Sequence, residues 1–335
     1  MSIRKARQGE NNLGSKKRDV GRPRQTFDVL VLATMSAGKS SFINALVGRS
    51  LLPAANEATT ACLTSIEHRR SAKSFRGICY SDAGDKIVTQ PDASLDEVRA
   101  WNADSQIRHI HLSGKFRTHR PPCTGLVLHD TPGPNNSQDD RHGELMLDAI
   151  HRVPFKLLCY VLNAGQLGTW DDRKLLEQLR ELLTQRPRRR LVFILNKVDL
   201  LDPERGEDLA GSVSKARQYL EGLGFVDPII VPTMANIALY ARKAMHNEPL
   251  TRVERTKLRH ALDELGLEQE NTLQASAMPE ALKAHVLREL KKSKSPPPLL
   301  PNDMQVDDVA ALEQLVIRSG IRTVEFLLNQ RSTAA

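Results

Sequence analysis

The sequence contains few aromatic residues and no apolar run long enough to cross a membrane. Phe, Trp and Tyr make up only 4% of the 335 residues, which provides no stacking platform for single-stranded nucleic acid. Apolar runs such as 155–162 (FKLLCYVL) have the length of a buried strand, well short of the roughly 20 residues of a membrane span. The N-terminus, MSIRKARQGENN, lacks the apolar core of a secretory signal. We therefore expect a globular cytoplasmic protein.

Cysteine is scarce, and neither cysteine nor histidine forms a metal-binding pattern. The four cysteines are Cys62, Cys79, Cys123 and Cys159. Their wide spacing fits neither metal ligands nor a disulfide framework, so we expect reduced thiols. His109 and His111 alternate along one predicted strand, but zinc would need further ligands and no cysteine follows at a suitable spacing. We expect these histidines to belong to a solvated polar strand face.

The net charge of +8 is concentrated in residues 1–26. This segment holds eight basic and two acidic residues, a net +6, so that +2 remains for the rest of the chain. Its polar composition predicts a disordered tail. Two interpretations stay open. The tail is either a solvated arm without function or an arm attracted to an anionic membrane surface or a nucleic acid.

After the tail, strand-like apolar runs alternate with helix-like stretches. The predicted strands are residues 27–33, 124–130, 155–163, 190–196 and 228–233. Their nearly continuous apolar runs indicate strands that are covered on both faces, as in a parallel sheet between helices. Residues 169–185 have the pattern of an amphipathic helix. This alternation predicts an α/β fold, a doubly wound and mostly parallel sheet with helices on both faces.

The C-terminal part of the sequence is expected to be helical. Residues 250–292 form a charged helical stretch, and the Pro-rich linker KKSKSPPPLLPND follows it. The last amphipathic helix is expected over about 306–330, with a bend at Gly320. We therefore divide the chain into a basic tail, residues 1–26, and one domain, residues 27–335, with a helical insertion over about 250–310.

The segment ATMSAGKS, residues 33–40, follows the first predicted strand and opens a predicted helix. It fits the phosphate-binding pattern G-x-x-x-x-G-K-[ST], except that Ala33 replaces the first glycine. In this pattern Gly38 lets the backbone approach a phosphate, Lys39 contacts the β- and γ-phosphates, and Ser40 is a ligand of Mg²⁺. The neighbouring residues expected around the phosphates are Ser36, Ala37 and Ser41.

A second motif, FILNKVD, ends a later strand and predicts which base is bound. The Asp199 carboxylate can accept two hydrogen bonds from guanine, through N1–H and the exocyclic amine, and adenine has no such donor pair. Asn196 is expected to brace the loop, and the Lys197 stem to lie over the purine. Ala235, in VPTMA, would donate its N–H to the guanine carbonyl. These residues predict binding of GTP and GDP.

Between the two motifs lies LHDTPGPNNS, residues 128–137. Asp130 at a strand end would hold Mg²⁺ through water, and the Gly133 N–H would sense the γ-phosphate. Thr60 is the candidate to ligate Mg²⁺ and to orient the attacking water, with Thr59 as an alternative that the sequence leaves open. The motifs occur in the order of a guanine-nucleotide switch, which predicts Mg²⁺-dependent hydrolysis of GTP.

Taken together, these motifs resemble the dynamin superfamily, particularly its bacterial dynamin-like branch. The segments SAGKSS, NALVGRSLLP, ATTA, DTPGPNN and NKVD carry the resemblance, which covers about residues 27–240. The 70 residues from Thr60 to Asp130 support it, because small Ras-like and Era-like GTPases fit this interval into roughly two dozen residues.

The resemblance implies that two GTPase domains pair face to face and thereby stimulate hydrolysis. With Lys39 and Thr60, it implies a catalytic role for Ser36, which would place a monovalent cation, K⁺ or Na⁺, against the charge of the transition state. Asp171 or Asp172 is the candidate acid for the pairing, although helix capping explains either residue equally well. Because dynamin-like proteins carry a long helical stalk after this domain, the resemblance leaves two alternatives, a shortened member that works with a larger dynamin-like partner or a truncated chain.

Two other functions are compatible with the motifs. One is a switch that holds GTP or GDP with negligible hydrolysis. The other is an Era-like GTPase that contacts nucleic acid through the basic tail, against which the 70-residue interval counts. A peripheral position at a membrane, again through the tail, stays open as well.

Overall fold

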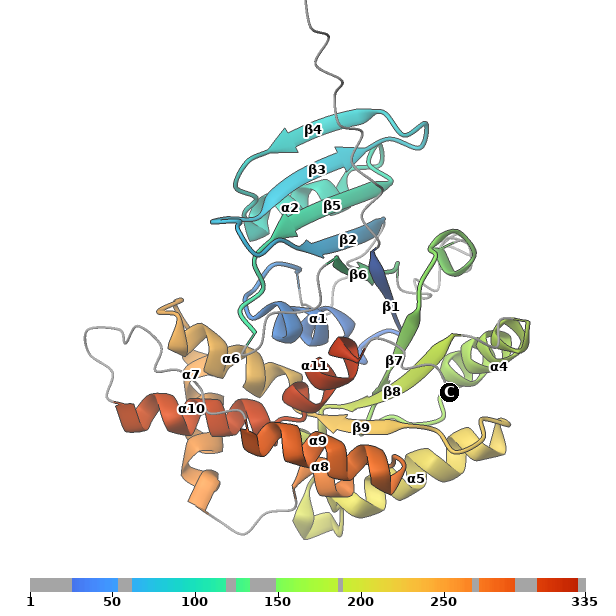
Figure 1. Ribbon diagram of the computed structural model, residues 1–335, viewed down its shortest axis with the longest axis vertical. Coiled ribbons are helices and arrows are strands. Elements are labelled where there is room, and N and C mark those ends of the chain that lie inside the picture. The colour runs from blue at the N-terminus through green and yellow to red at the C-terminus, as the bar shows by residue number, and fades with distance from the viewer. Residues whose placement is uncertain are drawn as a thin grey trace, which may run out of the picture.

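The computed structural model describes residues 26–53, 62–118, 125–132, 149–185, 189–266, 271–292 and 306–330. Within these ranges the strands form one sheet of nine, in the order β4-β3-β5-β2-β6-β1-β7-β8-β9. Figure 1 shows this sheet running the length of the molecule, with helices on both of its faces. The prediction of an α/β fold with a mostly parallel sheet is confirmed.

One half of the sheet is entirely parallel. Its strands are β6 (Leu126–Asp130), β1 (Phe27–Ala33), β7 (Leu157–Asn163), β8 (Arg190–Asn196) and β9 (Ile230–Thr233). The predicted bounds of β1 and β8 are correct, whereas β6, β7 and β9 each begin two residues later than predicted. A turn precedes β6 at Gly125, whose φ is 83°, because backbone groups in a turn cannot join the strand ladder.

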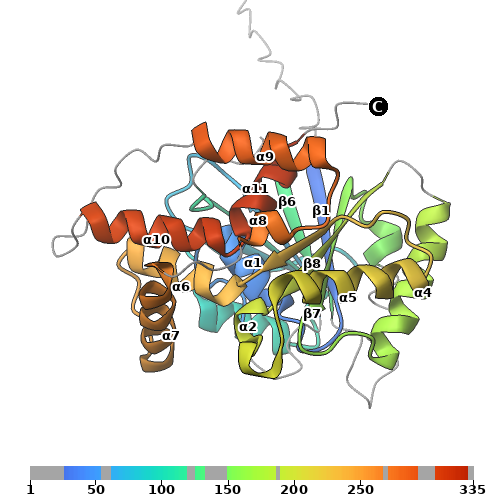
Figure 2. The same ribbon diagram turned by 90° about the horizontal axis from the view of Figure 1, so that it is seen from below.

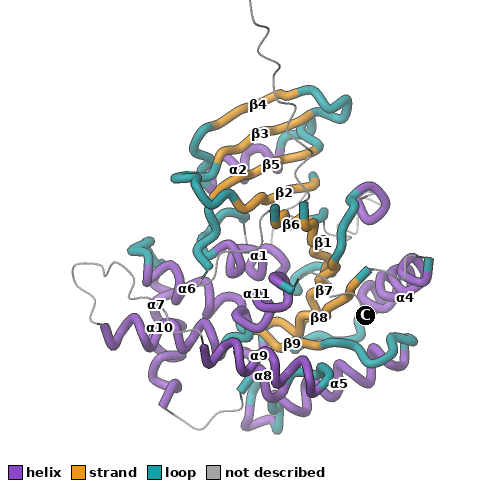
Figure 3. The backbone as a smooth tube through the Cα atoms, viewed as in Figure 1, coloured by secondary structure: helices purple, strands orange, loops and turns teal. Residues whose placement is uncertain are grey.

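The other half of the sheet reverses direction at β2 (Leu63–His68), which pairs antiparallel with β6. It continues through β5 (His109–Gly114), β3 (Arg76–Tyr80) and β4 (Lys86–Gln90), the four strands that lie side by side in Figure 3. Since β2 and β5 run opposite to β1 and β6, their C-terminal ends lie where β1 begins. We call that side the basal edge and the opposite side, where the parallel strands end, the carboxyl edge.

Helices cover both faces of the parallel half, as Figure 2 shows from below. On one face lie α1 (Lys39–Val47), α6 (Ala235–Met245) and α11 (Ile321–Asn329), with α2 (Leu95–Ala103) farther along on the same face. On the other face lie α4 (Trp170–Thr184) and α5 (Leu209–Gly222). The alternating side chains of β1 divide between the two cores, which is why its whole sequence is apolar except Asp28.

The remaining helices lie mainly beside α6, β9 and α11. They are α7 (Arg252–Asp263), α8 (Thr272–Ala275), α9 (Glu280–Lys292) and α10 (Val306–Arg318), and the short 3₁₀ helices are η1 (Val198–Leu200), η2 (Pro203–Arg205) and η3 (Glu264–Gly266). A third apolar cluster joins α6, α7 and α10. None of the described helices has both the length and the hydrophobicity that a membrane span requires.

The predicted last helix is interrupted rather than bent. Helix α10 ends at Arg318, and α11 restarts at Ile321 after Gly320. Gly320 has φ of 77°, and a Cβ there would lie 2.1 Å from the carbonyl oxygen of Pro232. Only glycine therefore allows the chain to turn so close to β9.

A buried polar chain crosses four strands on one face of the sheet. Nε2 of His129 lies 2.9 Å from Oδ1 of Asp28, Nδ1 of His129 lies 2.9 Å from the Ser65 hydroxyl, and that hydroxyl lies 2.8 Å from Nε2 of His109. The His109 and His111 rings are neighbours, 6.4 Å apart, on the same face. The strand face that we expected to be solvated is half-buried. The described residues include no group of three or more metal-ligating side chains.

Acid is expected to destabilise the fold through His109. Burial, with smaller contributions from His111 and His129, lowers the pKa of His109 from 6.5 to about 4. Between these pH values the unfolded chain binds a proton that the folded protein does not, so stability falls as pH falls from about 6.5 towards 4. In urea titrations we expect a loss of up to roughly 3 kcal/mol of unfolding free energy over this range. His109→Gln should flatten the dependence, and an identical pH profile in the variant would contradict the assignment.

Candidate functional site

The candidate phosphate loop, residues 34–38, joins β1 to α1 at the carboxyl edge. Ser36 and Gly38 both have left-handed backbones, with φ of 62° and 89°. A Cβ on Gly38 would lie 2.5 Å from Nδ2 of Asn196, so the position has no room for a side chain. Ala33, which replaces the first glycine of the pattern, lies within the regular strand β1. Alanine is compatible with the loop because a strand residue needs no special backbone.

The loop ends in the first turn of α1. Ala37 is buried, while Ser40 and Ser41 are half-buried in that turn. The first N–H groups of a helix have no partner inside the helix and can bind an anion. The first turn of α1 contains no acidic residue that would oppose a phosphate. This helix start therefore has the features expected of an anion site.

Lys39 and Asp130 meet between α1 and β6. The Lys39 ammonium donates hydrogen bonds to the Asp130 carboxylate and, over 2.6 Å, to the carbonyl of Thr131. Both side chains are buried, with 9% and 2% of their surface exposed. Asp130 thus lies where it interacts with a cation. Together with the hydroxyl of Ser40, it offers the oxygen ligands that Mg²⁺ prefers, so the residues present fit this ion.

Asn196, at the end of β8, connects the phosphate loop to the start of α6. Its Nδ2 donates to the Ala37 carbonyl over 3.0 Å, and its Oδ1 accepts from the Thr233 hydroxyl and the Ala235 N–H, each over 3.2 Å. Asn196 therefore has the contacts expected of a bracing residue. The Ala235 N–H, which we expected to donate to guanine, donates to Asn196 in this structure.

Lys197 and Asp199 lie just beyond Asn196, in a turn that leads into η1. Lys197 has a left-handed backbone with φ of 67°, and its Cε lies 3.7 Å from where a Cβ on Gly38 would be. Its stem therefore reaches back towards the phosphate loop. Burial raises the pKa of the Asp199 carboxyl, against the lowering effect of its own backbone N–H, Lys257 and Lys197. Burial disfavours the charged form of this carboxylate, so a ligand that donates hydrogen bonds to it would stabilise that form.

A supporting residue that the motifs did not reveal is Asp172, in the first turn of α4. Its Oδ1 accepts hydrogen bonds from the Tyr160 hydroxyl, over 2.6 Å, and from the hydroxyl of Thr34 at the start of the phosphate loop, over 3.2 Å. Only 2% of its surface is exposed, and burial raises the pKa of its carboxyl. Because Asp172 is buried, it cannot be the acid that meets a partner, which leaves the half-exposed Asp171.

A sequence signal for Asp172 exists in the helical pattern. Asp172 precedes Leu175, Leu176 and Leu179 by three, four and seven residues, so it lies on the apolar face of α4. An acidic side chain on that face requires a buried hydrogen-bond partner. Tyr160, in the middle of a buried strand, has the matching need for its hydroxyl.

Two predicted switch positions lie outside the described residues. They are Thr60, with its alternative Thr59, and Gly133. Their roles remain predictions from the sequence. The described site therefore consists of the phosphate loop with α1, Asp130 at the end of β6, and the residues after β8.

Three exposed apolar side chains lie at the same edge of the sheet as this site. Met35, Trp170 and Leu200 are three of the large hydrophobic residues that are exposed in the described ranges. They expose 56%, 71% and 60% of their surface. They follow β1, β7 and β8 respectively, so all three lie at the carboxyl edge. The Lys174 ammonium lies 4.9 Å from the centre of a Trp170 ring. Apolar groups gathered around a site are typical of a surface that contacts a partner.

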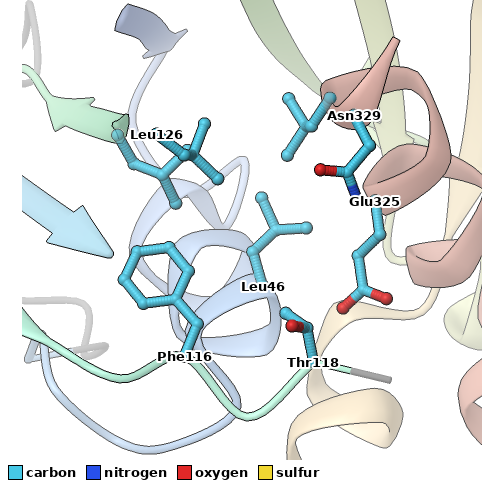
Figure 4. Close-up of a pocket in the computed structure, with 8 residues that line it drawn as sticks. Leu46, Phe116, Thr118, Leu126, Glu325 and Asn329 are labelled. Atoms are coloured by element: carbon cyan, nitrogen blue, oxygen red, sulfur yellow. The ribbon is translucent and has the colours of Figure 1, made fainter. Parts of the chain in front are cut away.

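A pocket elsewhere in the domain is not part of this site. Figure 4 shows Leu46, Phe116 and Leu126 pointing towards one another, with Glu325 and Asn329 of α11 across from them. The space among the lining residues is about 260 Å³, part of it open to solvent. The mostly apolar lining, with one carboxylate, does not suit a triphosphate.

Comparisons with known proteins agree on one family. The model of the dynamin family matches residues 29–198, which is 170 of the 335 residues. A bacterial dynamin-like protein of Nostoc punctiforme is 28% identical over 211 residues, covering 57% of this chain and 28% of that protein. Dynamin-like protein A of Bacillus subtilis is 27% identical over 168 residues, covering 50% of this chain and 13% of that protein. The chain thus spans less than a third of either relative.

A solved structure has the same fold. A bacterial dynamin, described as one of an oligomerised pair that provides a mechanism for long-range sensing and tethering of membranes, superposes with a TM-score of 0.51. The sequences are 18% identical, and the match covers 80% of this chain and 41% of that one. At this identity the likeness concerns the fold.

Proposed function

This chain belongs to the dynamin family, whose members are GTPases, and we propose that it binds GTP and hydrolyses it to GDP and phosphate. The observation that carries the proposal is the bond from Asn196 to the carbonyl of Ala37. It ties the candidate guanine-reading residues to the candidate phosphate loop. One nucleotide can therefore contact both motifs at the carboxyl edge.

The phosphates would lie against the first turn of α1. Here the backbone from Ser36 to Ser41 would surround the β-phosphate, and the missing side chain of Gly38 makes room for it. The Lys39 ammonium would exchange its contact with Asp130 for the β- and γ-phosphates. The Lys39 ammonium would contact negatively charged or carbonyl oxygens both before and after nucleotide binding. Its buried positive charge would therefore stay balanced.

Ser40 and Asp130 would hold Mg²⁺, which would supply positive charge for the β- and γ-phosphates. Loss of the Lys39 contact on nucleotide binding would let the Asp130 carboxylate take that role. Thr60 would orient the attacking water, and the Gly133 N–H would contact the γ-phosphate. Ser36, an exposed loop residue with a left-handed backbone, would place K⁺ or Na⁺ near the same phosphate.

The guanine base would lie against Lys197 and Asp199. The Asp199 carboxylate would accept both hydrogen bonds of the guanine edge, and the Lys197 stem would cover one face of the ring. In the free protein Asn196 uses the Ala235 N–H. That N–H would be shared with, or transferred to, the guanine carbonyl on binding.

We also propose that two copies pair across their carboxyl edges and that pairing stimulates hydrolysis. Met35, Trp170 and Leu200 form the exposed apolar rim that such pairing would cover. Trp170 is the largest of them and the most exposed, and buried aromatic anchors dominate the energetics of interfaces. Asp171, beside it, is the remaining candidate acid for the pairing.

Turnover per molecule should therefore rise with protein concentration, and Trp170→Ala should remove most of this rise. Loss of a central aromatic anchor costs at least about 2 kcal/mol, so the concentration for half-maximal stimulation should increase roughly 30-fold. Val226→Ala is the matched control, since Val226 exposes 87% of its surface but precedes β9 at the basal edge. Flat, near-zero turnover at every concentration would instead favour the nucleotide switch.

Further partners are proposed as well. The tail, residues 1–26, has a net charge of +6 and would contact an anionic membrane or a nucleic acid. The matched structure belongs to an oligomerised pair that tethers membranes, which favours the membrane and a larger dynamin-like partner. An Era-like role would instead require tail-dependent binding of RNA or DNA.

A further inference from the structure

The basal edge, opposite the candidate nucleotide site, carries a cluster of exposed basic side chains. Arg70 and Lys73 follow β2, Arg76 begins β3, and Lys115 follows β5. All four are exposed. They come together because β2 and β5 run antiparallel to β6, which brings the segments after both strands to the same edge. We call these four residues the basal basic patch.

The segments that carry the patch are in direct contact. The Arg69 N–H donates to the carbonyl of Gly114 over 2.7 Å, which joins the segment after β2 to the segment after β5. The positive charge of the patch affects the pKa of His68, which lies beside these segments. Burial and then the charges of Arg70 and Lys115 lower its pKa. Arg70 and Lys115, which are far apart in the sequence, therefore both lie close enough to His68 to affect its pKa.

Nearby carboxylates are engaged by other residues. Glu67 pairs with Arg69 over 2.8 Å, and Glu248 pairs with Arg117 over 2.6 Å. Within the part of the chain that the structure describes, the patch residues form no ion pair of their own. Exposed acids near the patch are Asp92, next to Pro91, whose carbonyl accepts from Ser74, and Asp96, which pairs with Arg99. A net positive surface remains.

The basic tail joins the domain at this same edge. Strand β1 begins at Phe27 on the basal edge, directly after Thr26. The segment 1–26, with its net charge of +6, is therefore attached on the side of the patch. Strands β7 and β8 begin here too, shortly after Lys156 and Arg189. Basic residues from separate parts of the chain therefore lie at this edge.

We propose that the basal basic patch binds the anionic phosphate headgroups of a membrane surface, with the carboxyl edge facing away from it. A flat membrane can contact the patch and the point where the tail joins the domain, because both lie at the basal edge. Trp170, the one strongly exposed aromatic in the described ranges, lies at the opposite edge, so the patch has no partner for base stacking. The patch consists of strand ends and loops, without a helix for a DNA groove.

This orientation is compatible with the proposed enzyme but does not depend on it. The patch shares no residue with the nucleotide site, so membrane binding and GTP hydrolysis can be measured separately. A domain bound through its basal edge would leave Met35, Trp170 and Leu200 accessible to a second copy. Pairing would then be compatible with membrane contact.

The test is sedimentation of the full chain with vesicles of phosphatidylcholine containing about 30% phosphatidylglycerol, compared with phosphatidylcholine alone. Each basic residue near an anionic surface contributes a factor of roughly five in the binding constant. The triple variant Arg70→Ser, Lys73→Ser, Lys115→Ser should therefore bind the anionic vesicles about 100-fold more weakly. Its GTP turnover and thermal unfolding should equal those of the wild type.

Two further variants separate location from net charge. Arg205→Ser, Lys215→Ser, Arg259→Ser removes the same charge from exposed positions on η2, α5 and α7 and should change binding by less than about threefold. Arg70→Lys, Lys73→Arg, Lys115→Arg keeps the charge and should bind like the wild type. Equal losses in the two serine variants, or unchanged binding of the patch variant, would overturn the proposal.

Duplex DNA and RNA serve as the competing ligands. If the patch variant loses binding to nucleic acid but keeps its binding to anionic vesicles, the patch is a nucleic-acid site and the membrane proposal is wrong. If the triple patch variant proves less stable, Lys115→Ser alone still decides. It should weaken vesicle binding roughly fivefold, and an unchanged constant would count against the patch.

Discussion

Lys39→Ala should raise the Kd for GTP by at least about 1000-fold, which isothermal titration calorimetry would measure. The Lys39 ammonium is buried at the first turn of α1, next to the loop that would surround the phosphates. In a buried place its interaction with a phosphate is stronger than at the surface, because less water screens it. Alanine removes that charge and leaves no other basic side chain in the first turn.

The same substitution should also lower stability, since it leaves the Asp130 carboxylate buried without its cation. Removing one partner of a buried ion pair costs roughly 3–5 kcal/mol. The double variant Lys39→Ala, Asp130→Asn also removes the carboxylate charge that has lost its lysine, and should recover most of that loss while still failing to bind GTP. This double variant distinguishes a lost ligand contact from a damaged fold. Wild-type affinity in either variant would show that residues 33–40 are not the phosphate loop.

Asp199→Asn should weaken GTP binding by about 1000-fold and improve binding of xanthosine triphosphate. The Asp199 carboxylate accepts two hydrogen bonds from guanine in our proposal, and an amide can accept only one while its NH₂ faces the guanine amine. Xanthine carries a carbonyl where guanine carries that amine, so the asparagine NH₂ finds an acceptor. The expected reversal is a change in preference rather than a general loss of binding.

Competition between GTP, xanthosine triphosphate and ATP measures that reversal directly. Asp227→Asn is the matched control, because the Asp227 side chain is 81% exposed in the segment before β9, at the basal edge. It should leave all three affinities unchanged. If Asp199→Asn lost GTP without gaining xanthosine triphosphate, Asp199 would support the loop but not read the base. Equal binding of ATP and GTP by the wild type would overturn the proposed specificity.

Much of the parallel half of the sheet could be predicted from the sequence, because local signals there agree with the tertiary structure. The apolar run of β1 leads into the Gly-Lys-Ser of α1, and the run of β8 leads into Asn196 and Lys197. A strand that is buried on both faces must be apolar throughout, so its position is legible in a single sequence. The predicted start of β6 is two residues too early. A strand begins where it can pair with its neighbour, and the turn at Gly125 prevents that pairing.

The candidate site was predicted less completely. Motif spacing identified Lys39, Asp130 and Asn196, and the structure brings them to one edge. Asp172 was predicted only as a candidate acid for pairing and not as a support of the phosphate loop, because the bonds of that carboxylate to Tyr160 and Thr34 join residues that no local pattern connects. The same contacts remove Asp172 from the candidates for pairing. An acid near a helix start looks like a cap whether it faces solvent or the core.

The sequence by itself determined the phosphate-loop and base-reading motifs, the α/β class and the basic tail. Each depends on neighbours within a few residues, and such short-range chemistry is written directly in the order of the chain. Only the tertiary structure decided that β2 and β5 run antiparallel to β6. This direction carries Arg70 and Lys115 to the edge where the tail joins the domain. Beyond the tail the charges sum to only +2. A sum over the sequence contains no direction, whereas strand direction decides on which side of the molecule each charge lies.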